Sequence, residues 1–297
     1  VVQKAIADAP AGTTILLENV RFHAGDEAND PAFAAALAAN GDVFVNDAFG
    51  SSHRDHASVT GPARVLPSAA GRLLEKEIAA FGRVLEKPAR PLVAILGGAK
   101  VSDKVNVIAN LLTKVDALLI GGAMAYTFYR AKGLPTGKSL VEDDKLEEAR
   151  TITADAAAKG VELALPVDHV VTTAIAADAP HETLDIDNAS IGERMGVDIG
   201  PKTIAKYEAL LRDAHTVVWN GPMGVFELAP FAGGTNAVAK AVAAVSGTTI
   251  VGGGDSISAI KKSGMSDRIT HISTGGGASL EFLGGRTLPG VAALGEK

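Results

Sequence analysis

The sequence predicts an α/β fold in which parallel strands are covered by helices on both faces. Short, almost wholly apolar runs alternate along the chain with segments of helical periodicity. Strands of this kind are typical of parallel sheets that are buried on both sides. Three of the apolar runs also stop at a cluster of glycines and continue as an expected helix. A helix closed by two prolines divides the pattern into a short N-terminal and a long C-terminal part.

The N-terminal part contains few elements. We expect strands at Thr14–Leu17 and Val43–Val45, separated by a helix over Pro31–Asn40 with Asp30 as its N-cap. A further helix over Leu73–Leu85 is followed by two prolines that mark a linker. Parallel strands that are buried on both faces need neighbours, so we expect this chain to begin inside a domain.

The C-terminal part alternates regularly between the two patterns. We expect strands at Leu92–Leu96, Ala117–Ile120, Val161–Leu165, Thr216–Trp219, Thr249–Val251 and Thr270–Ile272. Helices are expected at Asp103–Leu112, Met124–Ala131, Asp143–Lys159, Lys202–Ala214, Gly234–Val245 and Ser256–Lys262.

Composition and charge narrow the classes of function. The chain has 297 residues, 47% of them hydrophobic, and no stretch reaches the roughly 18 apolar residues of a membrane span. With no cysteine, disulfides, thiolate metal sites and a cysteine nucleophile are excluded. A net charge of −6 disfavours a general nucleic-acid surface. An anionic ligand would therefore need a few placed cations and backbone N–H groups, and a cytoplasmic location is expected.

The three glycine clusters predict a phosphate site. They are Gly97-Gly98, Gly252–Gly254 and Gly275–Gly277, each directly after or close behind an apolar run. Glycine lets bare backbone N–H groups approach a ligand, and the following helix adds unpaired donors and the positive end of its dipole. Three such loops in one sheet suggest a shared polyanion site, most simply for the phosphate tail of a nucleotide.

Several other motifs fail on inspection. Gly133–Ser139 resembles a Walker A loop, but three residues separate its glycines where four are required, and it follows a helix. His53–Asp55 imitates the catalytic loop of protein kinases, but Thr60 stands where an asparagine is expected. His53 with His56 alone makes a poor zinc site, and loop packing is the alternative. Without a GxGxxG motif, a standard dinucleotide fold loses its main support.

The remaining motifs are similar to those of one family over essentially the whole chain. Leu17–His23 and Asn46–Ser58 resemble the N-terminal domain of phosphoglycerate kinase. Four further segments resemble the C-terminal domain of that family: Leu96–Lys104, Trp219–Glu227, Gly252–Ser256 and Ser273–Ser279. The closing segment Leu288–Val291 is similar as well.

This resemblance implies two Rossmann-like, three-layer α/β/α domains with parallel sheets, joined by a hinge helix. Residues 1–85 would be the remaining part of the phosphoglycerate-binding domain with the interdomain helix, and residues 86–284 the nucleotide-binding domain. Residues 285–297 would form a tail that returns to the N-terminal domain. The implied activity is the reversible glycolytic transfer of a phosphoryl group between 1,3-bisphosphoglycerate and Mg-ADP, giving 3-phosphoglycerate and Mg-ATP. A hinge-bending monomer is expected.

The resemblance also implies a role for each cation and glycine near the phosphates. Lys100 matches the cation at the transferring phosphoryl group, and the N–H groups of Gly254, Gly276 and Gly277 would face that group. Catalysis there is mostly positioning and charge stabilisation. Lys104 corresponds to the lysine on the nucleotide phosphates, with a solvated helix face as its alternative.

The other nucleotide contacts follow from the same resemblance. Asp255 would be the Mg²⁺ ligand, because a carboxylate beside phosphate-binding backbone suits that ion; capping a helix is its alternative role. Glu227 matches the glutamate that holds the ribose hydroxyls. Ala123 stands where many relatives carry glycine, which would slightly narrow the adenine pocket. The remaining implied contacts are Gly196, Asn220, Gly253, Gly254 and Ser256.

Arg21 and Arg54 match arginines that hold the phosphoglycerate, and a guanidinium pairs bidentately with phosphate. His56 is expected to support Arg54 through a hydrogen bond. Family members begin with a strand that bears an aspartate and an asparagine, followed by an arginine and a His-Leu-Gly-Arg loop, and this pattern does not occur before Leu17. That arginine is the family's second catalytic cation, so we expect a chain starting at Val1 to bind nucleotide but to transfer phosphate poorly. The full gene product would be the active kinase.

Two alternatives to the kinase remain. A nucleotide-binding remnant with a non-enzymatic role would bind nucleotide without turnover. An unrelated α/β hydrolase or dehydrogenase would need a Gly-x-Ser-x-Gly elbow or a dinucleotide fingerprint, and the sequence contains neither. We expect no nucleic-acid or membrane partner.

Overall fold

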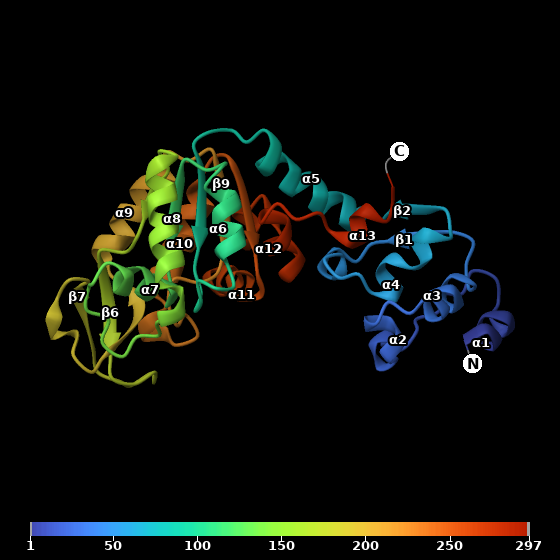
Figure 1. Cartoon of the computed structure of the whole chain (residues 1–297), viewed down its shortest axis with the longest axis horizontal. Helices are drawn as coiled ribbons and strands as arrows, with labels where there is room; N and C mark the ends of the chain where they lie inside the picture. The colour runs from blue at the N-terminus through green and yellow to red at the C-terminus, as the bar shows by residue number, and fades with distance from the viewer. Residues whose placement is uncertain (1, 296–297) are drawn as a thin grey trace. The chain divides into compact units, whose positions relative to one another are not determined.

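The computed structural model describes residues 2–295. The chain forms two compact units (Figure 1). The first consists of the residues up to Ala79 together with the segment from Arg286 onward, and the second of Ala80–Gly285. The domain boundaries expected after residues 85 and 284 stay predictions.

A parallel six-stranded sheet forms the centre of the second unit. Its strands lie in the order β11-β10-β9-β3-β4-β5, and every neighbouring pair is parallel. Four of the strands are wholly or almost wholly buried, which explains their continuous apolar sequence. The strands are β3 (Leu92–Leu96), β4 (Ala117–Ile120), β5 (Glu162–Ala164), β9 (Thr216–Asn220), β10 (Thr248–Gly252) and β11 (His271–Ile272).

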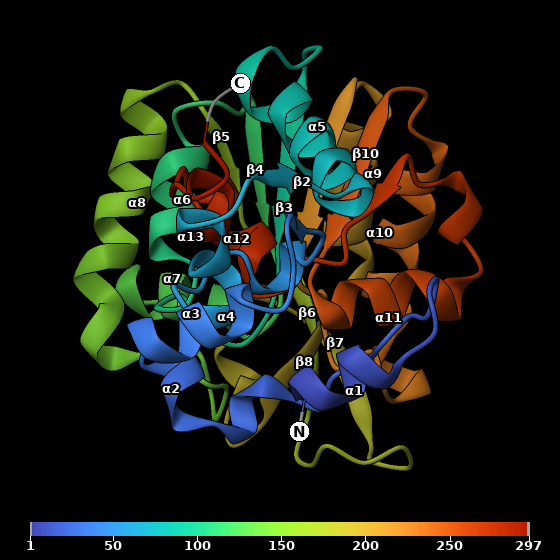
Figure 2. The same cartoon turned by 90° about the vertical axis from the view of Figure 1, so that its right-hand side faces the viewer.

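Helices cover both faces of this sheet, so the three-layer α/β/α architecture expected from the sequence is confirmed for this unit. Figure 2 shows α6 and α8 on one side and α9 and α10 on the other. The helices are α5 (Arg72–Glu86), in which the division between the units falls, α6 (Val105–Leu111), α7 (Met124–Ala131), α8 (Leu146–Ala158), α9 (Pro201–Arg212), α10 (Gly233–Ala244), α11 (Gly254–Ser263) and α12 (Gly277–Leu283).

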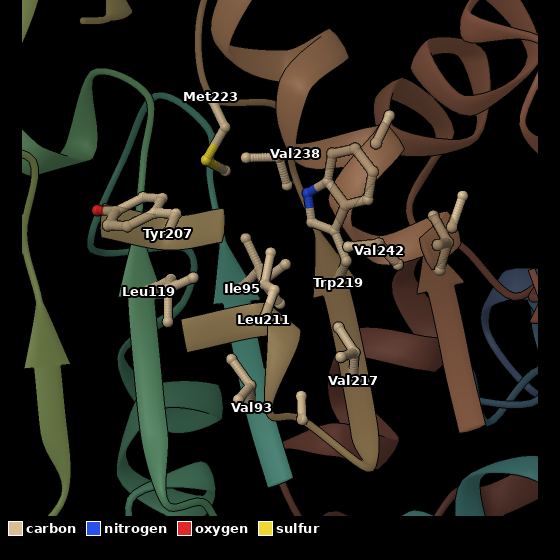
Figure 3. Packing of buried hydrophobic residues seen from close by; sticks show 14 of the residues in the cluster. Val93, Ile95, Leu119, Tyr207, Leu211, Val217, Trp219, Met223, Val238 and Val242 are labelled. Carbon is tan, nitrogen blue, oxygen red and sulfur yellow. The ribbon is translucent and has the colours of Figure 1, made fainter. Parts of the chain in front are cut away.

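The main core lies between the sheet and the helices α9 and α10. Trp219 of β9 is fully buried, and Figure 3 shows it beside Val238 and Val242 of α10. Tyr207 of α9 packs in the same cluster, and its hydroxyl donates to the carbonyl of Ile120 at 2.6 Å. Truncating a buried tryptophan lowers the free energy of unfolding by about 3–5 kcal/mol, so this core contributes strongly to the stability of the sheet.

A second sheet in this unit is antiparallel and was not expected from the sequence. Its strands β6 (Asp168–Thr172), β7 (His181–Asp185) and β8 (Met195–Ile199) lie in the order β7-β6-β8. Four of the five residues of β7 are exposed, so it has no apolar run. The buried strand β6 carries polar side chains that a sequence pattern assigns to a loop. Asp168, for example, accepts the backbone N–H groups of Lys202 and Thr203 at 2.9 and 2.8 Å.

The first unit contains a small parallel sheet of β1 (Phe44–Asn46) and β2 (Ser68–Ala70). The expected strand at Thr14–Leu17 is wrong: residues 13–19 form no helix or strand, and Leu16 is 95% exposed. An apolar run becomes a parallel strand only with a neighbouring strand to pair with, and β1 is paired to β2. The expected N-cap is confirmed, since Asp30 Oδ1 accepts the N–H of Phe33 at 2.7 Å.

Short helices complete this unit. They are α1 (Val2–Asp8), α2 (Ala24–Glu27), α3 (Pro31–Ala38), α4 (Ala57–Thr60) and α13 (Pro289–Ala292). The last of them brings the end of the chain back to β1, because Asn46 donates to the carbonyl of Gly290 at 3.0 Å and Gly290 donates to that of Ser52 at 2.8 Å. The 3₁₀ turns of the chain are Val20–Phe22, Phe49–Ser51, Pro62–Arg64, Asp143–Lys145, Ala189–Ile191, Ala229–Phe231 and Ser266–Arg268.

Within residues 2–295, no helix has both the length and the apolar character needed to cross a membrane.

Candidate functional site

The strand order of the six-stranded sheet indicates a ligand site at the carboxyl ends of β3 and β9. From β3 the chain moves outward to β4 and β5, and it later returns to the other side of β3 to form β9, β10 and β11. In open parallel sheets, ligands bind beyond the carboxyl ends of the strands at such a switch in direction. The segments that leave β3 and β9 are Gly97-Gly98 and Gly221-Pro222.

The loops at this point are locked together by backbone contacts. Gly97 donates to the carbonyl of Asn220 at 3.0 Å, and Gly122 donates to that of Met223 at 2.9 Å. A Cβ on Gly97 would lie 1.9 Å from the carbonyl oxygen of Pro222. Gly221 has φ +98°, and its Cβ would lie 2.2 Å from the oxygen of Gly97. These glycines are therefore required by the packing of one loop on the next.

Gly254 differs from them. A Cβ there would meet no atom of the described chain within 4 Å, and its φ lies outside the left-handed region. Neither packing nor backbone conformation demands glycine at this position, which is the first residue of α11. A ligand that approaches the bare backbone at the start of the helix would account for it.

A cavity of about 240 Å³ lies among these loops, entirely within the second unit. Part of its wall is polar or bare backbone, with Gly98, Glu227 and Asp255, and is called the polar end. Another part, called the apolar end, includes Tyr126, Tyr129 and Pro166; the two tyrosine rings lie 5.5 Å apart, and Tyr129 donates to the carbonyl of Pro166 at 2.8 Å. The wall also includes Ala123, His169, Gly196, Val197, Asp198, Ile199, Met223 and Val225. Such a division suits a ligand with a charged tail and a flat, mostly apolar head.

Lys104 is a buried cation close to this site. Its Nζ donates to Asn220 Oδ1 at 2.6 Å, and it forms no ion pair within residues 2–295. Burial lowers the pKa of Lys104 to about 8, although the carboxylates of Asp103 and Asp255 act to raise it. The Nδ2 of Asn220 is buried and has no hydrogen-bond partner in the described chain. Unused donors on both side chains fit an anionic ligand.

The glycine loop after β10 presents Asp255 in the first turn of α11, exposed and at the wall of the cavity. Ser256 is fully buried, and its Oγ accepts the N–H of Gly221 at 2.5 Å. This serine thus joins the loops after β9 and β10. Gly253 has φ +90° and lies against the amide of Asn220.

Asp255 fits a magnesium ion that is held mostly by phosphate and water. Within residues 2–295 no group of three or more histidine, cysteine or acidic side chains forms a metal cage. Mg²⁺ keeps several waters and commonly takes only one or two carboxylates together with substrate phosphates. A single exposed carboxylate beside Gly254 is therefore a suitable donor set.

The third glycine loop begins α12. Gly276 has φ +50° and precedes Gly277, the first residue of the helix. Gly275 donates to Ser273 Oγ at 3.1 Å, and this hydroxyl also bonds to Ser279 Oγ at 2.6 Å. Neither Gly276 nor Gly277 lines the cavity, so the structure places them at the same edge of the sheet but outside this pocket.

Lys100 also lies outside the cavity, exposed in the loop that follows β3. Glu142 holds this loop and was missed by the sequence analysis: its carboxylate accepts the N–H groups of Val101 and Ser102 at 2.6 and 3.1 Å. Partial burial acts to raise the pKa of Glu142, but the hydrogen bonds from Ser102 and Val101 and the charge of Lys100 lower it. The loop is thereby held in one conformation next to Lys100.

The residues expected to bind phosphoglycerate all lie in the first unit. Arg21, in the turn Val20–Phe22, and Arg54 are exposed. The imidazole of His56 lies 3.6 Å from the carboxylate of the buried Asp26, which also accepts the N–H of Ser58 at 2.8 Å. The hydrogen bond expected between His56 and Arg54 does not occur among the contacts of the described residues; His56 faces Asp26 instead.

Comparison with known proteins shows the family to which the chain belongs. The phosphoglycerate kinase family model matches residues 1–286. The phosphoglycerate kinase of Moorella thermoacetica is 58% identical over 100% of this chain and 75% of its own length, and that of Solibacter usitatus is 60% identical over 98% and 73%. Among solved structures, the phosphoglycerate kinase of Coxiella burnetii superposes with a TM-score of 0.90 at 45% identity, covering 95% of this chain and 73% of its own.

A second structure, phosphoglycerate kinase of Pyrococcus horikoshii, superposes with a TM-score of 0.86 at 35% identity, over 99% of this chain and 75% of its own. The fold and the family model define an α/β phosphotransferase of the kinase type. More particularly, the chain belongs to the phosphoglycerate kinase family. It spans about three-quarters of the length of the relatives that it matches.

Proposed function

We propose that the second unit binds ADP or ATP in the cavity beyond β3 and β9, as the nucleotide half of a phosphoglycerate kinase. The family's activity is the glycolytic phosphoryl transfer, with a carboxyl group as the acceptor in the reverse direction. The observation that carries the proposal is this cavity, whose wall combines an apolar, aromatic part with a polar part and bare backbone, as a nucleoside and its phosphates require.

In this arrangement the base occupies the apolar end and the ribose lies near Glu227. Gly196 lines the cavity with no room for a side chain, because a Cβ there would lie 1.4 Å from the Tyr126 hydroxyl. Ala123 also lies in the wall, and its methyl group therefore limits the space for the base. These contacts orient the nucleoside so that its phosphates run toward the glycine loops.

At the polar end, Lys104 and Asn220 receive the phosphates through donors that the chain leaves unused. The bare N–H groups of Gly253 and Gly254 add to them at the start of α11. Asp255 would hold Mg²⁺, which would neutralise phosphate charge when bound. Ser256 fixes the loop, because its Oγ accepts the N–H of Gly221, and its hydroxyl hydrogen is still available to donate to the nucleotide.

Transfer moves one phosphoryl group from an acyl phosphate to ADP. An oxygen of the ADP β-phosphate forms the new bond to phosphorus, and the bond from phosphorus to the carboxyl oxygen breaks, leaving 3-phosphoglycerate. The developing charge lies on the equatorial oxygens. We assign its stabilisation to Lys100 and to the N–H groups of Gly254, Gly276 and Gly277. Glu142 acts as a positioning residue, because it holds the loop that carries Lys100.

Binding of 3-phosphoglycerate or 1,3-bisphosphoglycerate is assigned to Arg21 and Arg54 of the first unit. His56 supports this region through the buried Asp26. We further propose a cytoplasmic monomer without a nucleic-acid or membrane partner; the net charge of −6 supports the absence of a nucleic-acid surface.

Calorimetry with Mg-ADP and with 3-phosphoglycerate, each alone, tests the proposal. The protein should bind ADP, and Ala123→Leu should weaken ADP binding strongly by filling the cavity. Ala157→Leu is the matched control, since Ala157 is an exposed alanine of α8. Equal ADP affinity of both variants would contradict the site. ADP binding without 3-phosphoglycerate binding would favour the alternative, a nucleotide-binding role without catalysis.

A further inference from the structure

A polar network lies at the apolar end of the cavity and plays no part in the roles described so far. His169 of β6 lines the cavity, yet only 3% of its surface is exposed. Its Nδ1 lies 2.7 Å from the hydroxyl of Tyr126, a second wall residue. Its Nε2 is buried and has no hydrogen-bond partner in the described chain. Buried polar atoms in native proteins are nearly always paired, so this nitrogen needs an explanation.

The network fixes which nitrogen of His169 carries the hydrogen. Gly196 donates its N–H to Ser139 Oγ at 3.0 Å. Burial raises the pKa of Tyr126, and a hydrogen bond from the Ser139 hydroxyl acts to lower it. If Ser139 donates to Tyr126 and Tyr126 donates to Nδ1, each of these hydrogens has an acceptor. In the opposite direction Ser139 Oγ accepts twice, and its own hydrogen has no acceptor among the hydrogen bonds of residues 2–295. The favoured direction makes Nδ1 an acceptor and leaves the hydrogen of the neutral ring on Nε2.

The ring is neutral at physiological pH. Burial lowers the pKa of His169 to about 4, with Asp168 and Asp185 acting to raise it and Arg194 to lower it further. The side chain therefore offers one N–H donor and no charge. A phosphate would be poorly matched by it, whereas a ring nitrogen of a base is a neutral acceptor of suitable strength.

We propose that His169 is a specificity-determining residue of the nucleotide site, whose Nε2–H donates a hydrogen bond to an acceptor nitrogen of a purine base in the apolar end of the cavity. The inference rests on the proposed function, because it assumes that the base lies at this end. Tyr126 acts as a positioning residue, since its hydroxyl keeps the hydrogen of His169 on Nε2. The Tyr126 and His169 rings lie 5.7 Å apart at 21°, which holds the imidazole plane in place.

Nuclear magnetic resonance of the wild-type protein tests this without any substitution. Long-range ¹H–¹⁵N spectra of the histidine rings should show His169 as the Nε2–H tautomer at neutral pH. Addition of ADP should shift the Nε2 and Hε2 resonances of His169, whereas pyrophosphate, which has no base, should leave them in place. An Nδ1–H tautomer, or equal shifts with both ligands, would overturn the proposal.

Modified nucleotides identify the acceptor. We compare the Kd values of ADP, 1-deaza-ADP, 3-deaza-ADP and 7-deaza-ADP for the wild-type protein and for His169→Phe. Loss of one neutral hydrogen bond corresponds to about a fivefold weaker Kd. With the wild-type protein, one of the three analogues alone should bind about fivefold more weakly than ADP. The His169→Phe variant should bind ADP and that analogue with equal affinity. His169→Gln, which retains an N–H donor, should recover part of the ADP affinity.

Several outcomes separate this inference from the proposed function. If Ala123→Leu weakens ADP binding while His169→Phe binds ADP as the wild type does, the inference fails and the nucleotide site stands. If the wild type does not bind ADP, both fail. If all analogues lose affinity alike in wild type and variant, His169 does not read the base. Circular dichroism and a thermal unfolding midpoint confirm that each variant is folded before its Kd is interpreted.

Discussion

The two ends of the cavity are built in different ways. The polar end consists of backbone loops that leave parallel strands, with glycines packed against one another, as Gly221 packs on Gly97. The apolar end consists of side chains from α7 and the antiparallel sheet, such as Tyr126 and His169. The first is specified by short motifs at strand ends. The second depends on residues far apart in the sequence, so that each end should respond differently to substitution.

The largest effect is expected from Gly97→Ala at the polar end. The new Cβ would lie 1.9 Å from the carbonyl oxygen of Pro222, and both atoms belong to locked backbone. Overpacking of this kind costs about 3 kcal/mol or more in the free energy of unfolding. Urea denaturation measures it, with Gly82→Ala as the control, because the nearest atom to a Cβ at Gly82 is a flexible carboxylate at 3.9 Å. A loss at Gly97 no larger than at Gly82 would show that the loops are not locked.

At the apolar end, the stability of the wild type should fall relative to His169→Phe as the pH is lowered from about 6.5 to about 4. The pKa of His169 is 6.5 in the unfolded reference and about 4 in the folded protein because of burial. Between these pH values the unfolded chain binds more protons than the folded protein does. The free energy of unfolding of the wild type therefore decreases as the pH falls, by about 3 kcal/mol over the whole window. Above pH 7 the difference in the free energy of unfolding between the two proteins no longer changes with pH.

Asp198 contributes the opposite slope in both proteins. Burial raises its pKa to about 7, against hydrogen bonds from Gly234 and Ile199 that lower it. Folded Asp198 therefore holds its proton where the unfolded chain has lost it, and stability falls as pH rises from 3.8 to about 7. Comparing variant with wild type cancels this contribution. Denaturation curves whose difference is independent of pH would contradict the neutral, buried state of His169.

Lys104→Met should weaken ADP binding about 10- to 100-fold, as expected for the loss of a hydrogen bond to a charged group. The free protein should not lose stability, because a buried cation without an ionic partner is costly to keep. Calorimetry and thermal unfolding measure the two effects. Lys261→Met, at an exposed position of α11, serves as the control. A destabilised variant with unchanged ADP affinity would assign Lys104 a structural role.

The affinity for ADP should decline above a pH of about 8. Burial lowers the pKa of Lys104 to about this value in the free protein, and only the protonated side chain pairs with phosphate. Once the free protein has lost this proton, binding must take it up, which costs up to tenfold in affinity per pH unit. Calorimetry in buffers of different ionisation enthalpy should detect about one proton taken up at pH 9. Affinity that is constant from pH 7 to 9.5 would argue against Lys104 at the phosphates.

The smallest effect is expected from Gly254→Ala. Its Cβ has free space, so stability should be unchanged or rise by up to about 1 kcal/mol, as replacing a helical glycine does. Nucleotide affinity should fall a few-fold, because the methyl group occupies space needed by the phosphates. Gly264→Ala is the reverse control: its φ of +72° makes alanine costly, while it lies at the far end of α11 and should leave binding unchanged.

The comparison explains what could be predicted from the sequence. The bounds of β3, β4 and α7 are confirmed residue for residue, because buried parallel strands and a regular helix have clear patterns. Lys104, Asn220, Asp255 and Glu227 were predicted from motifs at strand ends that resemble those of the phosphoglycerate kinase family. Lys104 and Asn220 share a 2.6 Å hydrogen bond, and Glu227 and Asp255 share the cavity wall. Their roles in binding and catalysis remain predictions.

The residues that were missed have no local signal. Strands β6 and β8 carry His169 and Asp198 at buried positions, where a single sequence shows polar residues in a loop-like pattern. Glu142 lies 40 residues from Ser102 in the chain, so no spacing rule links them. Thr14–Leu17 shows the converse error, since its apolar run looked like a strand but has no neighbouring strand to pair with. In each case the deciding factor is a partner that is distant in sequence.

Photoaffinity labelling tests the central claim, that ADP lies along this cavity, most directly. After irradiation of the protein with 8-azido-ADP, mass spectrometry should find the label on wall segments of the apolar end, within residues 122–129, 166–169 or 196–199. An excess of ADP should protect them, and pyrophosphate should protect them less. Labelling outside the cavity wall, or labelling that ADP does not prevent, would contradict the account.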